Sequence, residues 1–131
     1  MAKQIIKTEK APAPIGPYNQ AIKTGNMLFI SGQVAINPAT SELLTGSINE
    51  ETNQVMKNLS AILDEAGMQF SDVVKTTIYL SDMQLFAEVN DVYGKYFAGS
   101  GGEANFPARE TVAVKGLPKN VNVEISMIAA L

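Results

Sequence analysis

The chain has 131 residues, of which 46% are hydrophobic, and this length fits one domain with an apolar core of its own. It contains no Cys and no His, which excludes disulfides, thiol nucleophiles, Ser-His triads and His proton relays. The net charge is −3 and the ten Lys and Arg residues are scattered, whereas nucleic-acid binders usually carry a basic surface, so we expect no nucleic-acid partner.

The N-terminal part of the chain predicts short strands around a proline-rich loop. Residues 1–8 are compatible with an edge strand, and residues 18–22 with a second short strand. Between them, residues 11–17 (APAPIGP) are expected to be irregular, because Pro has no backbone donor and restricts the residue before it. Gly25-Asn26 then predicts a turn into the apolar run 27–36, which we interpret as a third strand.

Residues 49–66 predict an amphipathic helix. Its apolar residues recur at helical spacing: Val55, Leu59, Ile62, Leu63 and Ala66. Glu50 and Glu51 fall in the first turn, where the positive end of the helix dipole favours acidic side chains. Gly67 is able to take the left-handed conformation that ends many helices. A strand rich in β-branched residues is predicted next, at residues 73–80.

A second helix is predicted after this strand. Ser81 and Gln84 resemble a capping box at its start. Its apolar face carries Phe86, Val89, Tyr93 and Phe97. A glycine-rich loop at 99–102 (GSGG) lacks the Lys-Ser/Thr of a phosphate-binding loop, and it leads to the last two predicted strands, 109–115 and 121–131.

The order of these elements, β-β-α-β-α-β-β or close to it, predicts an α/β (α+β) fold. We expect a single domain over residues 1–131, with one mixed sheet and two helices packed on one of its faces. The strands are rich in apolar residues, so the other face also needs to be covered. Self-association is the expected cover, and a charged fraction of only 18% agrees with it.

We also expect no metal, no cofactor and no membrane contact. Zinc sites normally use Cys or His, which the chain lacks. No apolar run approaches the roughly 20 residues of a membrane span. Residues 1–10 carry charges throughout and lack the apolar stretch of a signal peptide, so we expect a cytoplasmic protein.

Arg109 and Glu124 are the main candidates for chemistry. Arg109 opens a predicted strand, and its planar guanidinium can bind a carboxylate through two hydrogen bonds; the alternative is a solvated or structurally ion-paired arginine. Glu124 alternates with apolar residues in 121–127, so its side chain points away from the apolar face. Either it is a solvated acid, or a second subunit covers it and raises its pKa toward the range useful in general acid–base catalysis.

Gly32 and Tyr18 are further candidates. Gly32 lies inside the apolar strand, where a glycine marks either the close approach of a ligand or backbone, or a β-bulge. Tyr18 follows Gly16-Pro17 and offers an aromatic body with a polar tip, although it could equally be a core tyrosine.

Four segments closely resemble the RidA (YjgF-type) imine deaminase family. They are IGPYNQA at 15–21, LFISGQ at 28–33, VVKTTIYLSDMQLFAEVNDVY at 73–93 and FPARETVAVKGLPKNVNVEISMIA at 106–129. The resemblance extends over nearly the whole chain, in the same order and spacing. It implies a chorismate-mutase-like fold and a homotrimer with its sheets facing inward. It also implies one active site in each cleft between subunits.

The resemblance implies roles for three of the residues already singled out. Arg109 matches the family arginine that binds the substrate carboxylate. Glu124 matches the acid that positions or activates water near the imine carbon. Tyr18 matches the tyrosine that lines the carboxylate pocket.

Four more residues gain a substrate-binding role from the resemblance. Ser31 and Gly32 match the strand that borders the substrate, and Asn90 matches an asparagine of the second helix near the cleft. Thr111 stands where many relatives have Cys. The family contact there is largely through the backbone carbonyl, so we expect activity to survive this difference, but not any thiol-dependent regulation.

The implied reaction is the hydrolysis of small reactive imines. The substrates are 2-aminoacrylate and 2-aminocrotonate, through their tautomers 2-iminopropanoate and 2-iminobutanoate. Water adds to the C=N carbon, ammonia leaves and a 2-keto acid results. The alternatives are a non-enzymatic trimer that senses 2-keto acids in the same clefts, a ribonuclease activity as ascribed to some relatives, and a holdase chaperone.

Overall fold

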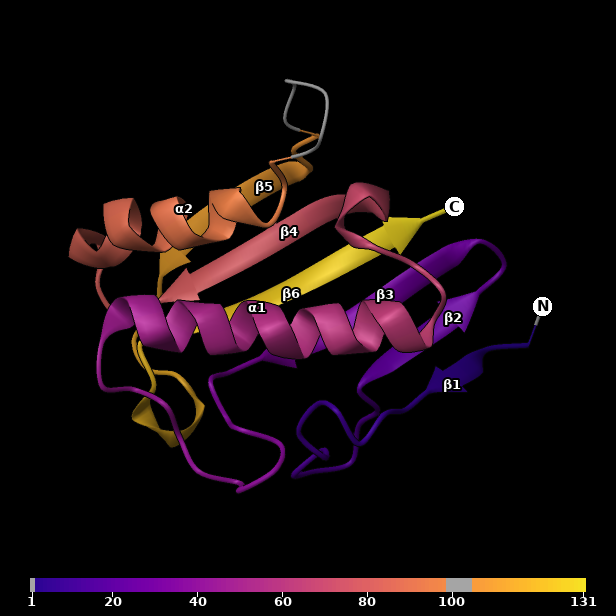
Figure 1. The fold of residues 1–131 in the computed structure, drawn as a ribbon, viewed down its shortest axis with the longest axis horizontal. Helices are drawn as coiled ribbons and strands as arrows, with labels where there is room; N and C mark the ends of the chain where they lie inside the picture. Colours follow the sequence, from indigo (N-terminus) through magenta and orange to yellow (C-terminus); the bar gives the residue numbers. More distant parts are fainter. Residues whose placement is uncertain (1, 99–104) are drawn as a thin grey trace.

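The computed structural model describes residues 2–98 and 105–131, and it shows a six-stranded sheet with two helices on one face (Figure 1). In spatial order the strands are β1 (Gln4–Ile6), β2 (Ala21–Thr24), β3 (Met27–Gln33), β6 (Val123–Ala130), β4 (Val73–Leu80) and β5 (Ala108–Ala113). The helices are α1 (Ile48–Glu65) and α2 (Phe86–Lys95). The predicted α+β fold, with a mixed sheet and two helices, is confirmed.

All neighbouring strands are antiparallel except β4 and β5, which are parallel because α2 carries the chain back between them. The sheet has six strands, one more than the predicted order contains, and the additional one is β1, which lies within the possible edge strand at residues 1–8 and pairs with β2. The strand predicted at 18–22 begins only at Ala21, so Tyr18 lies in the preceding loop. The strand predicted at 27–36 ends at Gln33, just after a register shift between Ile30 and Gln33.

Helix α1 begins and ends as its sequence predicts, to within one residue. The side chain of Ser47 accepts a hydrogen bond from the backbone N of Glu50 at 3.1 Å, so the helix starts at Ile48 and not at residue 49. At the other end, Gly67 has a φ of +73°, which is the left-handed conformation expected of it.

The predicted capping box of Ser81 and Gln84 is wrong. Asp82 provides the cap, because its carboxylate accepts a hydrogen bond from Gln84 N at 2.8 Å. Ser81 directly follows β4, and its side-chain Oγ donates to Asn122 Oδ1 at 3.1 Å, so this side chain does not cap a helix. The predicted glycine-rich loop at 99–102 lies outside the described residues.

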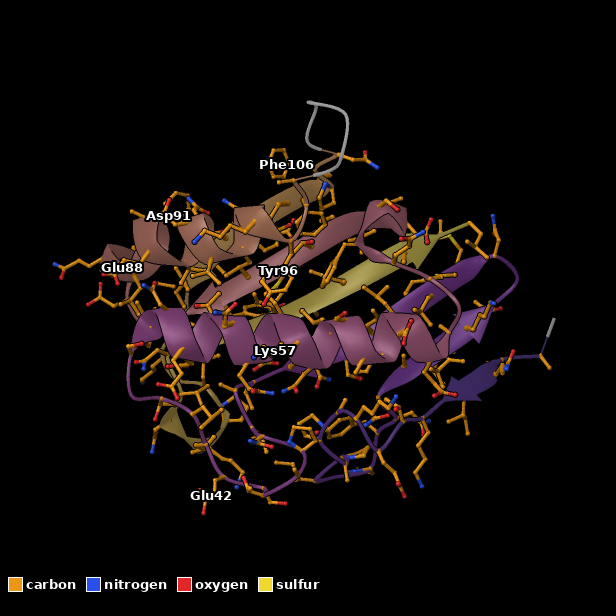
Figure 2. All side chains as sticks on the ribbon, viewed as in Figure 1. Glu42, Lys57, Glu88, Asp91, Tyr96 and Phe106 are labelled. Atoms are coloured by element: carbon orange, nitrogen blue, oxygen red, sulfur yellow. The ribbon has the colours of Figure 1, made fainter. Side chains whose placement is uncertain are left out.

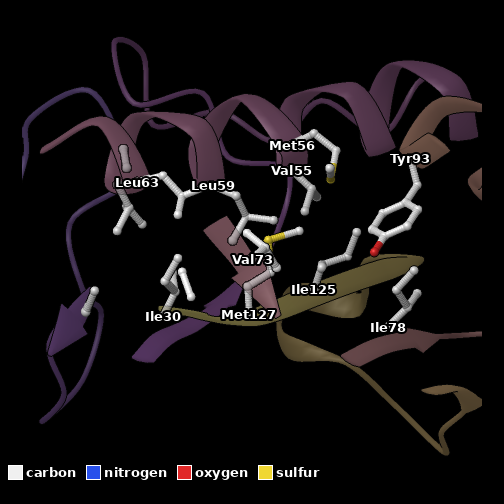
Figure 3. Close-up of a cluster of buried hydrophobic side chains, with 14 of the residues drawn as sticks. Ile30, Val55, Met56, Leu59, Leu63, Val73, Ile78, Tyr93, Ile125 and Met127 are labelled. Carbon is white, nitrogen blue, oxygen red and sulfur yellow. The ribbon is translucent and has the colours of Figure 1, made fainter. Parts of the chain in front are cut away.

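The core lies between the two helices and the sheet. Figure 3 shows apolar side chains of α1 pointing toward those of the central strands. The buried set includes Leu28, Ile30, Val55, Met56, Leu59, Leu63, Ile78, Ile125 and Met127. Along β6 every second side chain is buried, from Val123 to Ala129, while the side chains between them are half-buried on the opposite face. The alternation predicted for residues 121–127 is therefore confirmed.

The face of the sheet opposite the helices, here called the open face, is also largely apolar. Phe29 is 43% exposed and Val112 is 44% exposed, although both belong to strands. Ile22 and Ile128 pair with Phe29 from its two neighbouring strands and are half-buried. Exposed apolar side chains that lie together on a sheet, as Ile22, Phe29 and Ile128 do, are typical of a surface that contacts another protein chain.

Two glycines test how backbone conformation contributes to this fold. A Cβ atom would meet nothing within 4 Å at either Gly67 or Gly94, but Gly67 has a positive φ while Gly94 is inside α2. Gly67→Ala is expected to lower the free energy of unfolding by about 1 kcal/mol or more. Gly94→Ala is expected to raise it by up to about 1 kcal/mol. Urea denaturation at equal protein concentration measures both, and changes of the same sign would contradict this account.

Candidate active site

A hollow of about 370 Å³ brings together four of the residues predicted from the sequence. Tyr18, Ser31, Gly32 and Glu124 line it, and we call it the Glu124 hollow. Its other walls come from the proline-rich loop, from the chain after β3 and from Pro118, and they are mostly apolar. A small polar group therefore stands in an apolar surrounding, which is typical of ligand sites.

Glu124 lies directly over Gly32. A Cβ atom built on Gly32 would be only 2.8 Å from Glu124 Cδ, a distance that packed atoms do not adopt. The pairing of β3 with β6 also shifts register between Ile30 and Gln33. The register shift agrees with the interpretation of Gly32 as part of a β-bulge. The group that approaches its backbone closely is a side chain, and not the ligand or backbone of the other interpretation. That group is the candidate acid.

Burial in this hollow raises the pKa of Glu124 above its ordinary value. From the sequence alone, such a shift is expected only where another subunit covers the carboxyl group. A single chain already produces it, because the carboxyl group lies against the sheet and not in open water.

Ser31 and Tyr18 are held by local hydrogen bonds beside this carboxyl group. Ser31 Oγ donates to Asn19 O at 2.6 Å, which ties β3 to the loop that carries the tyrosine. Tyr18 is exposed rather than a core residue, and its hydroxyl oxygen accepts a hydrogen bond from Ile15 N at 3.4 Å. The tyrosine ring is therefore available to contact a ligand.

Arg109 is the only arginine of the chain and lines a second hollow of about 290 Å³. We call this the Arg109 hollow. Its guanidinium donates to Asn90 Oδ1 at 2.7 Å and lies over the rings of Phe86 and Tyr93, at 5.6 Å and 5.2 Å from their centres. Phe106 borders the hollow and lies above α2 in the view of Figure 2.

These contacts fix the guanidinium without neutralising it. Within residues 2–98 and 105–131 the one ion pair joins Lys75 to Glu110, so Arg109 has no acidic partner there. Tyr93 supports it from the core, since its hydroxyl donates to Thr76 Oγ1 at 3.0 Å and burial raises the pKa of the phenol. The sequence left a structural ion pair open as the role of Arg109, and the structure gives no support to it.

Thr111 follows Arg109 by two residues on β5, at the edge of the sheet. The backbone N of Val114 donates to Leu80 O of β4. Because backbone groups alternate along a strand, the N–H and C=O of Thr111 point away from β4, where no strand pairs with them. Its hydroxyl is buried without a hydrogen-bond partner.

The two hollows lie on opposite faces of the sheet. Arg109 pairs in register with Thr76, which faces the helices, whereas Glu124 pairs with Tyr79, three residues further along β4. Side chains an odd number of positions apart on a regular strand point to opposite faces. One chain therefore brings Tyr18, Ser31, Gly32 and Glu124 together in one place. It brings Arg109 and Asn90 together in another.

Gln20 is a residue of the site that the sequence analysis missed. It is buried and lines the Glu124 hollow, and its amide makes four hydrogen bonds to the backbone of Thr8, Ala11 and Pro12. These bonds hold the proline-rich loop against β2. A lone Gln before an apolar pair usually indicates a solvated strand end, so the sequence gives no signal for this role.

The described residues offer neither a metal site nor a membrane span. No group of three His, Cys, Asp or Glu side chains there could hold a metal ion. Neither helix is both long and apolar enough to cross a membrane.

Comparison with known proteins identifies close relatives. Residues 8–131 match the family model described as Endoribonuclease L-PSP. A RutC family protein of Pyrococcus abyssi is 53% identical to this chain, and the alignment covers 98% of each of the two chains. The 2-iminobutanoate/2-iminopropanoate deaminase of Mus musculus is 46% identical over 97% of this chain and 90% of its own. The crystal structure of E. coli TdcF with bound serine is similar with a TM-score of 0.90, at 37% identity and 98% coverage of both chains.

The raised pKa of Glu124 predicts a stability effect whose sign can be checked. The folded protein holds this proton more tightly than the unfolded chain, so stability falls as the pH rises from about the ordinary value of 4.5 through the folded pKa. Glu124→Gln should therefore raise the melting temperature at pH 7 and have little effect below pH 4.

Glu110→Gln is the matched control for this prediction. Hydrogen bonds from Thr77 and Lys75 lower the pKa of Glu110, so its contribution is present at neutral pH and is lost as the pH falls. This variant should melt at a lower temperature than wild type at pH 7, by a small amount because the group is exposed. A lower melting temperature for Glu124→Gln at pH 7 would refute the assignment.

Proposed function

The chain belongs to the Endoribonuclease L-PSP family, which includes the RidA (YjgF-type) reactive-intermediate deaminases, and we propose that it hydrolyses 2-imino acids to 2-keto acids and ammonia. The observation that carries the proposal is the state of Arg109. Its guanidinium is half-buried, held by an amide and two rings, and has no acidic partner in the described chain. Most of its five donors are therefore left for a ligand.

We propose that Arg109 binds the carboxylate of the substrate. A guanidinium and a carboxylate form two parallel charge-assisted hydrogen bonds, which fix the orientation of the ligand as well as its position. The bound serine of E. coli TdcF is a molecule of this chemical type, with a carboxylate next to a carbon that carries nitrogen. The name of the mouse relative supports 2-iminopropanoate and 2-iminobutanoate as substrates.

We assign to Glu124 the movement of protons. Water forms a bond to the imine carbon as Glu124 accepts one of its protons, and the electron pair of the C=N bond moves to the nitrogen. The protonated carboxyl group then returns the proton to this nitrogen, which gives a carbinolamine with an OH and an NH2 group on the same carbon. Glu124 next takes the proton of this OH group and passes it to the NH2 group, so that the C–N bond breaks, ammonia leaves and the C=O bond forms. A carboxyl group with a raised pKa suits both steps, and the reaction requires no cofactor.

We further propose that the working protein is a homotrimer, because Arg109 and Glu124 of one chain lie on opposite faces of its sheet. A complete site forms when the Arg109 hollow of one copy meets the Glu124 hollow of the next. The apolar open face around Phe29 and Val112 supplies surface for such contacts. Each of the three clefts of the trimer would then hold one substrate molecule. We also propose that the protein is cytoplasmic.

Ribonuclease activity is the second candidate, because the description of the family model names it. The net charge of −3 and the absence of His argue against it in this chain. RNA cleavage that stays constant through further purification, and is lost in a point variant, would favour it over the deaminase.

The direct test is the rate at which 2-keto acid appears from 2-aminocrotonate, supplied by a threonine dehydratase. Wild type should accelerate this step, and Arg109→Ala should lower kcat/KM on the order of 100-fold or more, because two charge-assisted hydrogen bonds are lost. Arg109→Lys should fall between them, since it keeps the charge but not the two-donor fork. Lys115→Ala, which removes an exposed cation just beyond β5, is the control and should act as wild type. No acceleration by an oligomeric wild type would point instead to a metabolite-binding role.

If each active site is shared between two chains, a mixture of two inactive variants should regain activity. Arg109→Ala and Glu124→Gln should each lower activity on the order of 100-fold or more, the second while it still binds a 2-keto acid. In a ring assembled at random from equal amounts of both, about a quarter of the interfaces combine an intact Arg109 with an intact Glu124. The mixture should therefore regain about a quarter of wild-type activity. A mixed assembly, verified by native mass spectrometry, that stays inactive would place both residues in a site within one chain.

A further inference from the structure

We propose that Glu51 of α1 is a positioning residue for Glu124. From the side of the sheet that the helices cover, its carboxylate fixes the start of β6 and so the place of Glu124 on the open face. The inference rests on the function proposed for Glu124, but it concerns a residue that touches neither substrate nor the reacting atoms.

Glu51 is fully buried, with an exposed fraction of 0%. One carboxylate oxygen accepts hydrogen bonds from the backbone N of Asn122 at 2.7 Å and of Val123 at 3.0 Å. The other accepts one from Asn122 Nδ2 at 2.8 Å. All three partners are N–H donors, so only a group that accepts at both oxygens satisfies them. No ion pair involving Glu51 occurs in the described parts of the chain.

These three bonds hold Asn122 and Val123, the two residues directly before Glu124. On the N-terminal side of Asn122 lies a constrained turn. Lys119 and Asn120 both have a φ of +56°, a backbone conformation that residues other than glycine rarely adopt. Such a turn is stable only where contacts with the surrounding structure hold it in this conformation. Pro118, at the start of this turn, lines the Glu124 hollow. Glu51 therefore secures two parts of that hollow at once, the acid and the proline wall.

Asn122 connects this carboxylate to the rest of the sheet. Its backbone O accepts from Ser81 N at 2.9 Å, and its side-chain Oδ1 accepts from Ser81 Oγ at 3.1 Å. The end of β4, the first turn of α1 and the start of β6 thus meet at one residue. Without the Glu51 contacts, this end of β6 would be held only by the two Ser81 bonds and by its strand pairing, and its position relative to α1 would be less fixed.

The space around Glu124 makes a small displacement important. Its side chain lies over Gly32 because that residue has no Cβ, and the fit leaves no room for one more carbon atom. A shift of about 1 Å in the reacting geometry commonly costs an enzyme on the order of 100-fold in rate. The start of β6 therefore has to be held more firmly than folding alone would need.

The test compares Glu51→Gln with Glu50→Gln. Both remove one negative charge from the first turn of α1, but Glu50 is exposed, and the carboxylate that binds Asn122 and Val123 is that of Glu51. A glutamine at position 51 accepts at one atom only, so with its oxygen toward the backbone N–H groups of Asn122 and Val123 its NH2 group faces Asn122 Nδ2, which is also a donor. Glu51→Gln should lower kcat at least about tenfold and leave KM within about twofold, because the Arg109 anchor is untouched. Glu50→Gln should match wild type in both.

Two further measurements separate positioning from a loss of folding. The pKa of Glu124, followed by the ¹³C shift of its carboxyl carbon, should move toward the ordinary value in Glu51→Gln and stay raised in Glu50→Gln. The double variant Glu51→Gln with Asn122→Asp exchanges donor for acceptor across the pair, so all three bonds can form again with the net charge unchanged. It should recover most of kcat and the raised pKa.

The outcomes are distinct. If Glu51→Gln keeps the wild-type kcat and Glu124 pKa, the inference is overturned. It is also overturned if the double variant folds but recovers neither, and this decides the case in which Glu51→Gln does not fold. If wild type shows no deaminase activity, the proposed function fails, and the pKa of Glu124 in the same variants still decides the role of Glu51.

Discussion

Strand β6 lies between β3 and β4, and its side chains alternate between the two faces of the sheet. Each face has a different role. On one face its apolar side chains complete the core beneath α1. On the other, Glu124 stands over Gly32 in a partly apolar hollow that raises its pKa. A shift of one residue in the register of this strand would exchange the two sets. The same pairing that forms the core therefore places the acid.

The walls of the Glu124 hollow are loops, and each is tied to the interior by one buried polar side chain. Gln20 holds the proline-rich loop through four hydrogen bonds. Asn58 of α1 donates to the backbone O of Val34 at 3.1 Å and of Ile36 at 3.0 Å, which holds the chain after β3. Glu51 holds the turn before β6. An irregular backbone is thus kept in place by groups whose own hydrogen bonds are satisfied.

Periodicity was enough to predict the elements that pack against the core. The spacing of Val55, Leu59 and Ile62 gave α1, and the alternation around Glu124 gave its face, because both patterns report local geometry. The roles of Gln20 and Glu51 could not be predicted in this way. Glu51 meets its partners 71 and 72 residues away, and a favourable position in the first turn of a helix is a complete local explanation for it.

The candidate site shows the same division. The chemistry of Arg109 could be named from its side chain, but not whether an acid neutralises it, since that depends on α2 and β5 packing together. Only the family resemblance assigned Ser31, Asn90 and Thr111 to a site. The sequence also gave no sign that Arg109 and Glu124 fall on opposite faces, because this follows from which residues of β4 they pair with.

The strand at the centre of the sheet is the last of the described strands in the chain. During synthesis, β1, β2 and β3 emerge first and β4 and β5 later, but the two groups have no direct pairing until β6 enters between them. A ribosome-bound chain without that segment holds two separate sheet fragments with unpaired edges, the state most exposed to aggregation. The strand that carries Glu124 into its hollow is then also the strand that completes the sheet.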